Sequence, residues 1–246
     1  MNILVCISKA PETTTKVSFK ENNTKFNEEG VQYIVNPADE WYALVRGLEL
    51  KEQHGGKVTT ITVGKEDDEP IIRKALAIGA DDAIRINAEP LDGFYVAKQI
   101  EEHAKEGGYD MILCGNETIN YNGGQVPGMI AELMDIPYVA NANDLQMEGE
   151  TATIEHKIQG GSEVLEVKPP FILGATKGMA EQRIPNMRGI MAARQKQLNV
   201  VEPIDIEMHT SVRDYELPPP KSECKFVDAE NPEKLLDLLK NEAKVL

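Results

Sequence analysis

The chain of 246 residues is long enough for one large domain, or for one domain with an appendage. Apolar residues make up 41% of it and charged residues 27%, which leaves enough apolar side chain for a buried core and excludes wholesale disorder. Forty-one acidic residues against 26 Lys and Arg give a formal net charge of −15. Because this charge repels phosphate backbones and anionic lipid, we do not expect nucleic acid as the main ligand.

The apolar runs of the sequence are short. Residues 33–35 and 111–114 are among the longest, and both fall far below the ~20 residues that a membrane helix needs. The apolar patch at residues 3–7 is too short for the hydrophobic part of a secretory signal, and no positive charge precedes it. We therefore expect a cytoplasmic protein without a membrane span.

The three cysteines, Cys6, Cys114 and Cys224, form no CxxC pair and lie far apart in the sequence. The four histidines do not have the spacing of metal ligands either. We expect neither a disulfide framework nor a metal site, and we interpret these residues as isolated core or surface positions.

The first two thirds of the chain alternates strand-like and helix-like segments. Short runs of apolar and β-branched residues predict strands at residues 2–7, 32–35, 57–63, 82–86 and 111–114. Apolar residues at helical spacing predict helices at residues 39–54, 69–78, 91–105 and 126–134. This alternation is typical of an α/β fold, a mostly parallel sheet with helices on both faces.

The pattern changes after residue 134. Strands are predicted at residues 137–145, 151–159 and 163–167, with Gly160-Gly161 as a hairpin tip, so the sheet should gain an antiparallel extension. After Val201 the periodicity is lost until an amphipathic helix at residues 232–244, and three prolines at 218–220 predict a stiff, extended stretch. We divide the chain into an α/β domain, residues 1–201, and a C-terminal arm, residues 202–246. The arm is either a strap over its own domain or a segment that grips a partner.

Ligands of an open parallel sheet bind outside the carboxyl ends of the strands, where the strand order reverses. Four loops qualify, at residues 8–15, 36–39, 64–68 and 115–128. In the fourth, Gly123 and Gly124 let backbone amides approach an anion at a helix start, and Asn120, Asn122 and Gln125 offer hydrogen bonds to a ribose or base. The loop has no lysine and no Walker spacing, so it predicts nucleotide binding without phosphoryl transfer. The alternative is a plain tight connection.

The Asn36-Pro37 step also has two interpretations. It is either an Asx turn that opens the helix at Asp39, or a place where the Asn36 side chain contacts the base or ribose. No Ser-His-Asp or Cys-His arrangement and no pair of carboxylates stands out from the acidic sequence, so catalysis by side chains is not indicated.

Segments spread along the chain match one known family in order and spacing. They are residues 2–9 with Pro11-Glu12-Thr13, Val35-Asn36-Pro37-Ala38-Asp39, residues 72–81, Gly160-Gly161 with Glu163, and Glu181 with Arg183, Pro185-Asn186 and residues 190–196. On these segments the chain resembles, along almost its whole length, the beta (small) subunit of the electron transfer flavoproteins.

The resemblance implies a Rossmann-like nucleotide-binding domain, similar to the adenine nucleotide alpha hydrolases, in an electron carrier subunit that is not an enzyme. It implies a heterodimer with an alpha subunit that holds most of an FAD, while this chain binds AMP or a second FAD. The heterodimer would shuttle electrons from an acyl-CoA or other flavin dehydrogenase to an acceptor. Carried over by position, the cofactor-binding residues are Cys6, Asn36, Pro37, Ala38, Asp39, Val63, Gly115, Thr118, Asn120, Asn122, Gly123, Gly124, Gln125 and Val126.

The resemblance leaves AMP and FAD as alternatives for this site. Gln125-Val126 resembles the members that split electron pairs with a second FAD. Asn120-Tyr121-Asn122 departs from the acidic run that those members have at this place. We favour FAD and keep AMP open.

Partner docking is implied by a second set of residues. Met179 stands where the family has the Leu that anchors dehydrogenases, and the sequence keeps Glu181 and Arg183, the latter near the flavin. We expect residues 176–184 to form an exposed loop between a strand at 171–174 and a helix that begins near Pro185. The alternative is a plain connection with Met179 in the core, since Met packs readily.

Two other classes of function compete with an electron carrier. An adenine-nucleotide-binding sensor of the universal-stress type shares the α/β architecture, but it accounts for neither residues 181–196 nor the arm. An adenylating ligase needs a Ser/Gly-rich phosphate loop after the first strand, and Ser8-Lys9-Ala10-Pro11 is not one.

Overall fold

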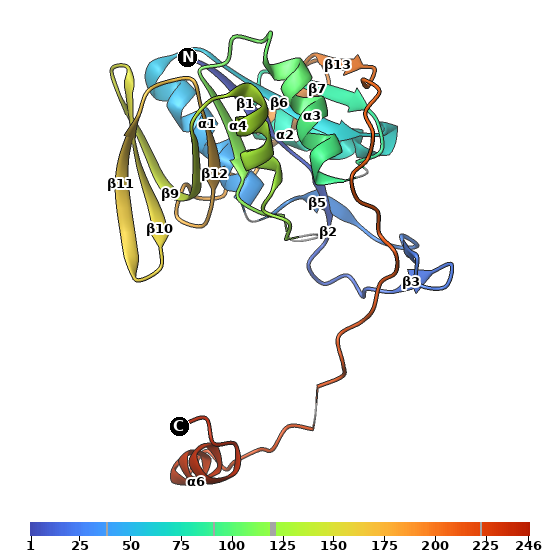
Figure 1. The fold of residues 1–246 in the computed structure, drawn as a ribbon, viewed down its shortest axis with the longest axis vertical. Helices are drawn as coiled ribbons and strands as arrows, with labels where there is room; N and C mark the ends of the chain where they lie inside the picture. The colour runs from blue at the N-terminus through green and yellow to red at the C-terminus, as the bar shows by residue number, and fades with distance from the viewer. Residues whose placement is uncertain (38, 91, 119–121, 222) are drawn as a thin grey trace.

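The computed structural model describes residues 1–37, 39–90, 92–118, 122–221 and 223–246. Among these residues, nine strands form one sheet in the order β11-β10-β9-β12-β8-β1-β6-β7-β13 (Figure 1). The parallel strands are β1 (Asn2–Cys6), β6 (Lys57–Gly64), β7 (Asp82–Asn87), β8 (Met111–Gly115), β9 (Tyr138–Glu148), β12 (Phe171–Ala175) and β13 (Leu198–Val201). β10 (Thr151–Ile158) and β11 (Gly161–Val167) continue the sheet in antiparallel pairing. The expected parallel sheet with an antiparallel extension is confirmed.

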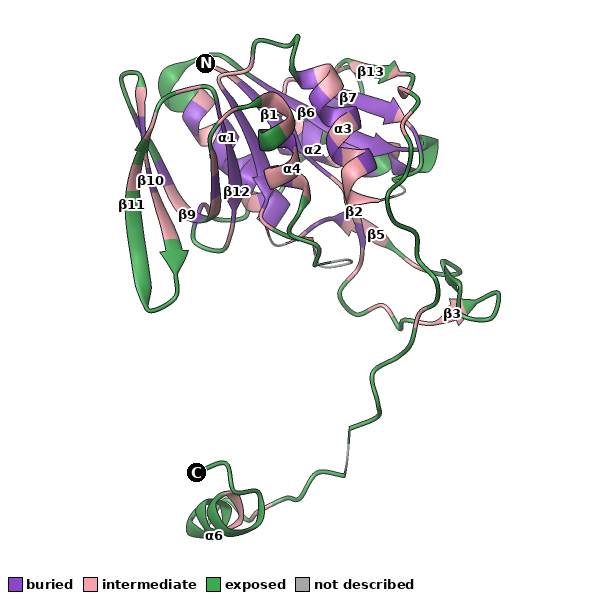
Figure 2. Cartoon of the chain, in the orientation of Figure 1, coloured by how far each residue is buried: buried purple, intermediate pink, exposed green. Residues whose placement is uncertain are grey.

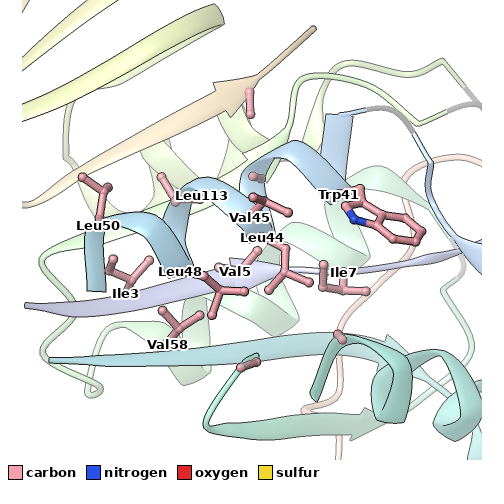
Figure 3. Packing of buried hydrophobic residues seen from close by; sticks show 14 of the residues in the cluster. Ile3, Val5, Ile7, Trp41, Leu44, Val45, Leu48, Leu50, Val58 and Leu113 are labelled. Atoms are coloured by element: carbon pink, nitrogen blue, oxygen red, sulfur yellow. The ribbon is translucent and has the colours of Figure 1, made fainter. Parts of the chain in front are cut away.

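Helices pack on both faces of this sheet. They are α1 (Asp39–His54), α2 (Glu69–Ile78), which follows a short 3-10 turn, α3 (Gly93–Ala104), α4 (Val126–Met134) and α5 (Met187–Ala193). Side chains alternate along a strand, so Ile3 and Val5 of β1 lie in the core with α1 and α2, whereas Leu4 and Cys6 lie in the core with α3 and α4. Figure 3 shows Leu44 of α1 packed against β1 in the first of these cores.

The helices predicted at 39–54, 69–78 and 126–134 have the bounds that their patterns indicated. α3 begins later than predicted, at Gly93, because Asp92 caps it: Asp92 Oδ1 accepts a hydrogen bond from the backbone N–H of Tyr95 at 2.6 Å. The first turn of a helix cannot satisfy its own N–H groups, so such a cap fixes where the helix starts.

The strand predicted at residues 32–35 is present as β5 (Tyr33–Val35), but it lies outside the parallel sheet. It pairs antiparallel with β2 (Lys9–Pro11) in a sheet of its own. A parallel neighbour of β1 needs a crossover of a dozen or more residues, usually a helix. The connection between β2 and β5 instead holds the small ribbon of β3 (Phe19–Lys20) and β4 (Lys25–Phe26), so the chain folds back on itself.

The C-terminal arm follows β13, and its first part lies along the α/β domain. The Gln99 side chain exchanges two hydrogen bonds with the backbone of Ile204, at 2.7 and 3.0 Å. Asp92, the cap of α3, also accepts a hydrogen bond from the backbone N–H of His209 at 2.8 Å. This part of the arm has the geometry of a strap.

The second part of the arm extends away from the domain (Figure 1). The last contact before it is the stack of Tyr215 on Phe19, with ring centroids 5.0 Å apart. In the described residues beyond Tyr215, the hydrogen bonds found stay within the arm itself. It ends in α6 (Glu233–Asp237) and a π-helical turn (Leu238–Glu242), and it is exposed along almost its whole length (Figure 2).

Met179 lies in the hydrophobic core, so the expectation of an exposed anchor at this residue is wrong. Only 3% of it is exposed, and it packs in the same core as Phe171 and Ala175 of β12. The backbone N–H of Met179 donates to Thr176 O at 3.2 Å, which turns the chain back toward the sheet directly after β12. The alternative of a plain connection with Met179 packed inside is confirmed.

Within the described residues, none of the helices is both long and apolar enough to cross a bilayer.

The burial of Met179 predicts a stability effect. Met179→Ala should lower the free energy of unfolding by about 2–5 kcal/mol, because the substitution leaves a cavity in a packed core. Met187→Ala is the matched control: Met187 is 72% exposed, so its truncation should change stability by no more than about 0.5 kcal/mol. Urea denaturation followed by circular dichroism measures both. Equal stabilities of the two variants would contradict the buried position.

Candidate functional site

The strand order reverses between β1 and β8. From β1 the chain proceeds to β6 and β7 on one side, and it then crosses back to β8 on the other side of β1. A crevice forms outside the carboxyl ends at such a switch point, because the two connections diverge there. Cys6 and Gly115, the last residues of β1 and β8, mark this place in the sequence.

The first turn of α1 lies directly against the end of β8. A Cβ atom built on Gly115 would lie 2.9 Å from Glu40 Cγ and 3.0 Å from Asp39 Cβ, distances that packed side chains do not adopt. The backbone N–H of Glu117 donates to Asp39 Oδ2 at 3.2 Å, which ties the loop after β8 to the same turn. The glycine is therefore what allows the helix and the loop to meet.

Glu40 connects this turn to the loop after β1. The backbone N–H of Ser8 lies 2.6 Å from Glu40 Oε2, and the Ser8 hydroxyl lies 2.6 Å from Oε1. Burial raises the pKa of the Glu40 carboxyl to about 8, and the two hydrogen bonds from Ser8 offset only part of that effect. Burial also raises the pKa of Asp39. Burial is thus the largest cause of the raised pKa values of Asp39 and Glu40 in the first turn of α1.

Two thiols lie near the carboxyl ends of β1 and β8, on the other face of the sheet. Cys6 and Cys114 are buried and lie side by side on β1 and β8. The hydrogen bond with Cys114 raises the pKa of the Cys6 thiol most, and burial raises it further. The Cys6 thiol therefore stays neutral, and both side chains pack as small apolar groups.

Asn36, three positions before the start of α1 at Asp39, is fully buried, and its side chain has no partner among the described residues. Neither its Oδ1 nor its Nδ2 has a hydrogen bond among the described residues. Leaving a buried amide unsatisfied costs about 1–3 kcal/mol, so such groups are rare unless something outside the chain completes them. Asn36 fits a ligand that both donates and accepts a hydrogen bond, as an adenine or a ribose does.

The glycine-rich loop leads from β8 into α4. Gly124 has φ = +58° and Asn122 has φ = +47°, which turn the backbone toward the helix start. A Cβ atom on Gly123 would meet nothing within 4 Å, so open space lies beside this backbone. Gln125, the N-cap of α4, makes no side-chain capping bond, and the first N–H groups of α4 are left for a ligand.

A hollow lies on the same edge of the sheet, at the ends of β6 and β7. It has a volume of about 610 Å³, opens widely to solvent, and is lined by Lys65, Glu66, Asp67 and Asn87. None of these four side chains has a buried polar atom without a partner. We therefore place the candidate site at the switch point, where Asn36 has two such atoms.

The structure brings most of the expected residues to this edge. Asn36, Asp39, Cys6 and Gly115 surround the switch point, and Thr118, Asn122, Gly123, Gly124, Gln125 and Val126 belong to the loop between β8 and α4. Pro37 precedes α1, and Val63 lies two residues beyond Ile61, the partner of Cys6 on β6. Ala38 and Asn120 lie outside the described residues.

Glu40 and Ser8 are absent from the expected site, although they join two of its loops. Asp39-Glu40 looks in the sequence like any acidic pair at a helix start, where it complements the helix dipole. The pairing of Glu40 with Ser8 bridges 32 positions, and no local pattern shows it.

Glu181 and Arg183 are the two expected docking residues that follow the buried Met179. Arg183 contacts the C-terminal end of α1. Glu181 is exposed, and Arg183 makes two hydrogen bonds to the Glu52 carboxylate, at 2.6 and 3.2 Å. The Glu52 carboxylate raises the pKa of Arg183, but the pair is half-exposed and adds little to stability. Gln182 donates a hydrogen bond to Pro37 O, so the segment after Met179 is tied to the entrance of α1.

An apolar surface follows Arg183. Ile184, Met187 and Met191 are 85%, 72% and 66% exposed, and they lie on α5 and the turn before it. Residues 183–196 contain no acidic residue in a chain with a formal net charge of −15. Exposed apolar side chains close together in sequence, with basic neighbours on an acidic protein, are typical of an interaction surface.

Comparisons with known proteins agree with this geometry. A family model described as "Electron transfer flavoprotein domain" matches residues 23–206. The electron transfer flavoprotein subunit beta of Bacillus subtilis is 34% identical over 260 aligned positions that cover all of both chains. The protein of the same name from Syntrophomonas wolfei is 31% identical over 251 positions, covering 100% of this chain and 98% of its own. The acryloyl-CoA reductase electron transfer subunit gamma of Anaerotignum propionicum is 30% identical over 209 positions, 82% of this chain and 78% of its own.

The mostly parallel sheet with helices on both faces, together with these matches, defines an electron transfer protein of the α/β class. The chain belongs to the beta-subunit family of the electron transfer flavoproteins. The family match decides against the universal-stress sensor considered from the sequence.

Proposed function

We propose that this chain is the electron-carrying beta subunit of a heterodimeric flavoprotein, and that it binds an adenine nucleotide at the crevice between β1 and β8. The fully buried Asn36 side chain, with neither polar atom satisfied, is the observation that carries the proposal. The backbone N–H of Asn36 donates to Ser8 O in the loop after β1, and the glycine-rich loop and the uncapped start of α4 follow the neighbouring strand β8 at the same edge of the sheet.

Each part of the crevice suits one part of the nucleotide. The amides of Gly123 and Gly124 and the first N–H groups of α4 hold phosphate, and the Asn36 amide binds the base or ribose. Cys6 and Val63 provide an apolar wall for the base. An FAD at this place supplies electron transfer through its flavin, whereas AMP supplies only structure. Gln125-Val126 favours FAD, and AMP stays the alternative.

The partners follow from two exposed surfaces. We assign the outer part of the arm, residues 216–246, to the alpha subunit that holds the other FAD, because its apolar helix has no support from its own domain. We assign Ile184, Met187 and Met191, with Glu181 and Arg183 beside them, to a flavin dehydrogenase such as an acyl-CoA dehydrogenase. The name of the A. propionicum relative, an electron transfer subunit of acryloyl-CoA reductase, supports a partner of this kind. The carrier role without catalysis and the cytoplasmic location stay predictions.

The nucleotide site can be tested at Gly124. Gly124→Asp should reduce bound adenine nucleotide about tenfold or more, because it places a carboxylate where the phosphates bind. Gly124→Asn is the matched control, since Asn tolerates the positive φ of +58° equally well and carries no charge. Acid extraction of the purified heterodimer and chromatography of the adenine measure occupancy. If the Asp and Asn variants retain equal nucleotide, this loop does not hold phosphate.

The arm can be tested by two truncations. A chain that ends at Tyr215 keeps the contacts of the strap but should fail to co-purify with the alpha subunit, because the apolar helix beyond is missing. A chain that ends at Val201 should fail as well. Co-expression with a tagged alpha subunit gives the yield of complex. Full yield with both truncated chains would contradict a role of the arm in assembly.

The docking surface can be tested at α5. The double change Met187→Ser and Met191→Ser should slow electron transfer from a dehydrogenase about tenfold, because interface anchors of this size contribute roughly 1–2 kcal/mol. Stability should change by less than about 0.5 kcal/mol, since both side chains are exposed. Val164→Ser on β11, also exposed, is the control that should leave transfer unchanged. Stopped-flow reduction of the heterodimer measures the rate, and an unaltered rate in the double variant would remove α5 from the docking surface.

A further inference from the structure

α5 is a short helix with its small residues turned inward and its large apolar residues turned outward. Gly189 and Ala193 lie one turn apart on the inner side, and Ala193 is packed in the core. Met187 and Met191 lie two positions from these residues, on the opposite side of the helix, and are exposed. Apolar packing therefore contributes little to holding the helix that carries the proposed docking surface.

A helix of this length is not stable by itself. α5 has seven residues, and isolated helices shorter than about 12–15 residues are marginal in water. Its start is capped, because Asn186 Oδ1 accepts a hydrogen bond from the backbone N–H of Gly189 at 2.8 Å. The position of α5 on the domain must come from contacts of its inner side and of its C-terminal end.

The inner side lies directly on the backbone of α2. A Cβ atom built on Gly189 would overlap the carbonyl oxygen of Ala77 in α2. Only glycine lets the two helices approach this closely. A side chain at residue 189 would push α5 away from the domain.

The C-terminal ends of α2 and α5 are capped by cations from each other's segment. Arg73 of α2 donates from Nη1 to Ala193 O at 2.9 Å and to Lys196 O at 2.7 Å, at the end of α5. Lys196 donates from Nζ to Leu76 O at 2.9 Å and to Ala80 O at 2.5 Å, at the end of α2. The last carbonyls of a helix have no partner within it and attract positive charge, so both ends are stabilised.

This reciprocal capping joins two segments that lie far apart in the sequence. Arg73 belongs to residues 72–81 and Lys196 to residues 190–196, and the hydrogen bonds between them and the opposite helix span 120 positions. Both side chains are half-buried and are directed at backbone carbonyls. They act on the position of α5 and do not belong to its exposed side.

We propose that Arg73 and Lys196 are positioning residues for electron transfer, because they hold α5 on α2 and so present Met187 and Met191 to the dehydrogenase in one arrangement. This inference rests on the docking surface proposed above. Without one of the cations, carbonyls at the helix ends lose their partners and α5 frays. Docking then has to order the helix first, which weakens the complex. Electron transfer within the complex, once it has formed, stays the same.

The test uses the intact heterodimer as electron acceptor of a flavin dehydrogenase supplied with its reduced substrate. Turnover at increasing heterodimer concentration gives KM and kcat separately. Lys196→Met and Arg73→Met should each raise KM about tenfold at unchanged kcat, as expected when binding alone is lost. Lys196→Arg keeps a cation with several donors and should leave KM near that of the natural chain.

Lys74→Met is the matched control. Lys74 follows Arg73 on α2, but its Nζ lies over the ring of Trp41, 4.8 Å from the ring centroid. The substitution removes the same charge from the same helix and leaves the caps of α2 and α5 in place. Its KM should equal that of the natural chain, whereas a tenfold increase would mean that net charge, and not the capping, affects docking.

A further comparison shows whether the effect passes through α5. In a chain that already carries Met187→Ser and Met191→Ser, Lys196→Met should raise KM little further, because the side chains that α5 presents are gone. Hydrogen exchange of the amides of residues 189–193 should also become faster in Lys196→Met. A role in stability alone would accelerate this exchange and leave KM unchanged.

The outcomes separate this inference from the docking surface on which it rests. If the double Met variant raises KM but Lys196→Met and Arg73→Met do not, the docking surface stays and the positioning role is overturned. If the double Met variant leaves KM unchanged, the docking surface is overturned, and this inference with it. If Lys196→Met does not fold, Gly189→Ala decides, because its methyl group displaces α5 from Ala77 O, and a normal KM would contradict the inference.

Discussion

The contact between Gly115 and the first turn of α1 is the constraint on which the rest of the site depends. A side chain at residue 115 would overlap Glu40 and Asp39, so only glycine lets the end of β8 reach the helix. This contact brings the loop after β8 to Asp39, and through Glu40 it also fixes the loop after β1. Two loops that begin on different strands thereby share one helix start, and the unsatisfied Asn36 lies beside it.

Much of this arrangement follows from sequence patterns. The bounds of α1, α2 and α4 were predictable because each has an apolar face of helical period and a clear stop, such as Gly79 after α2. The loop at 115–128 was predictable as a connection at the carboxyl edge of the sheet, because glycines follow a buried strand and precede a helix. Its role in ligand binding stays a proposal. The carboxyl edge of a parallel sheet collects such loops whatever their sequence.

Other features depend on contacts that no local pattern encodes. β3 and β4 have only two residues each, and Tyr215 of the arm stacks on Phe19 to support them. Met179 is buried because the chain turns back at Thr176, and its sequence neighbourhood is that of an exposed loop. The Ser8–Glu40 pair joins residues 32 positions apart. Tertiary contacts of this kind override propensity and can be found only in the folded chain.

The molecule combines a packed α/β domain with outer segments that this domain does not cover. The proposed site lies at strand ends and at the start of a long helix, and contacts between them fix the relative positions of its loops. Residues 184–191 and the end of the arm expose apolar side chains instead, such as Met187 and Leu236, and these need partners. This division suits a subunit that keeps one nucleotide in place while it assembles with another chain and meets a dehydrogenase.

A crystal structure of the heterodimer with its co-purified nucleotide tests the central claim most directly. We expect density for an adenine nucleotide between the carboxyl ends of β1 and β8, with the Asn36 side chain hydrogen-bonded to the base or ribose and the phosphates against the amides of Gly123 and Gly124. A crevice that holds only water, with nucleotide in the alpha subunit alone or in the hollow beside Lys65 and Asn87, would contradict it.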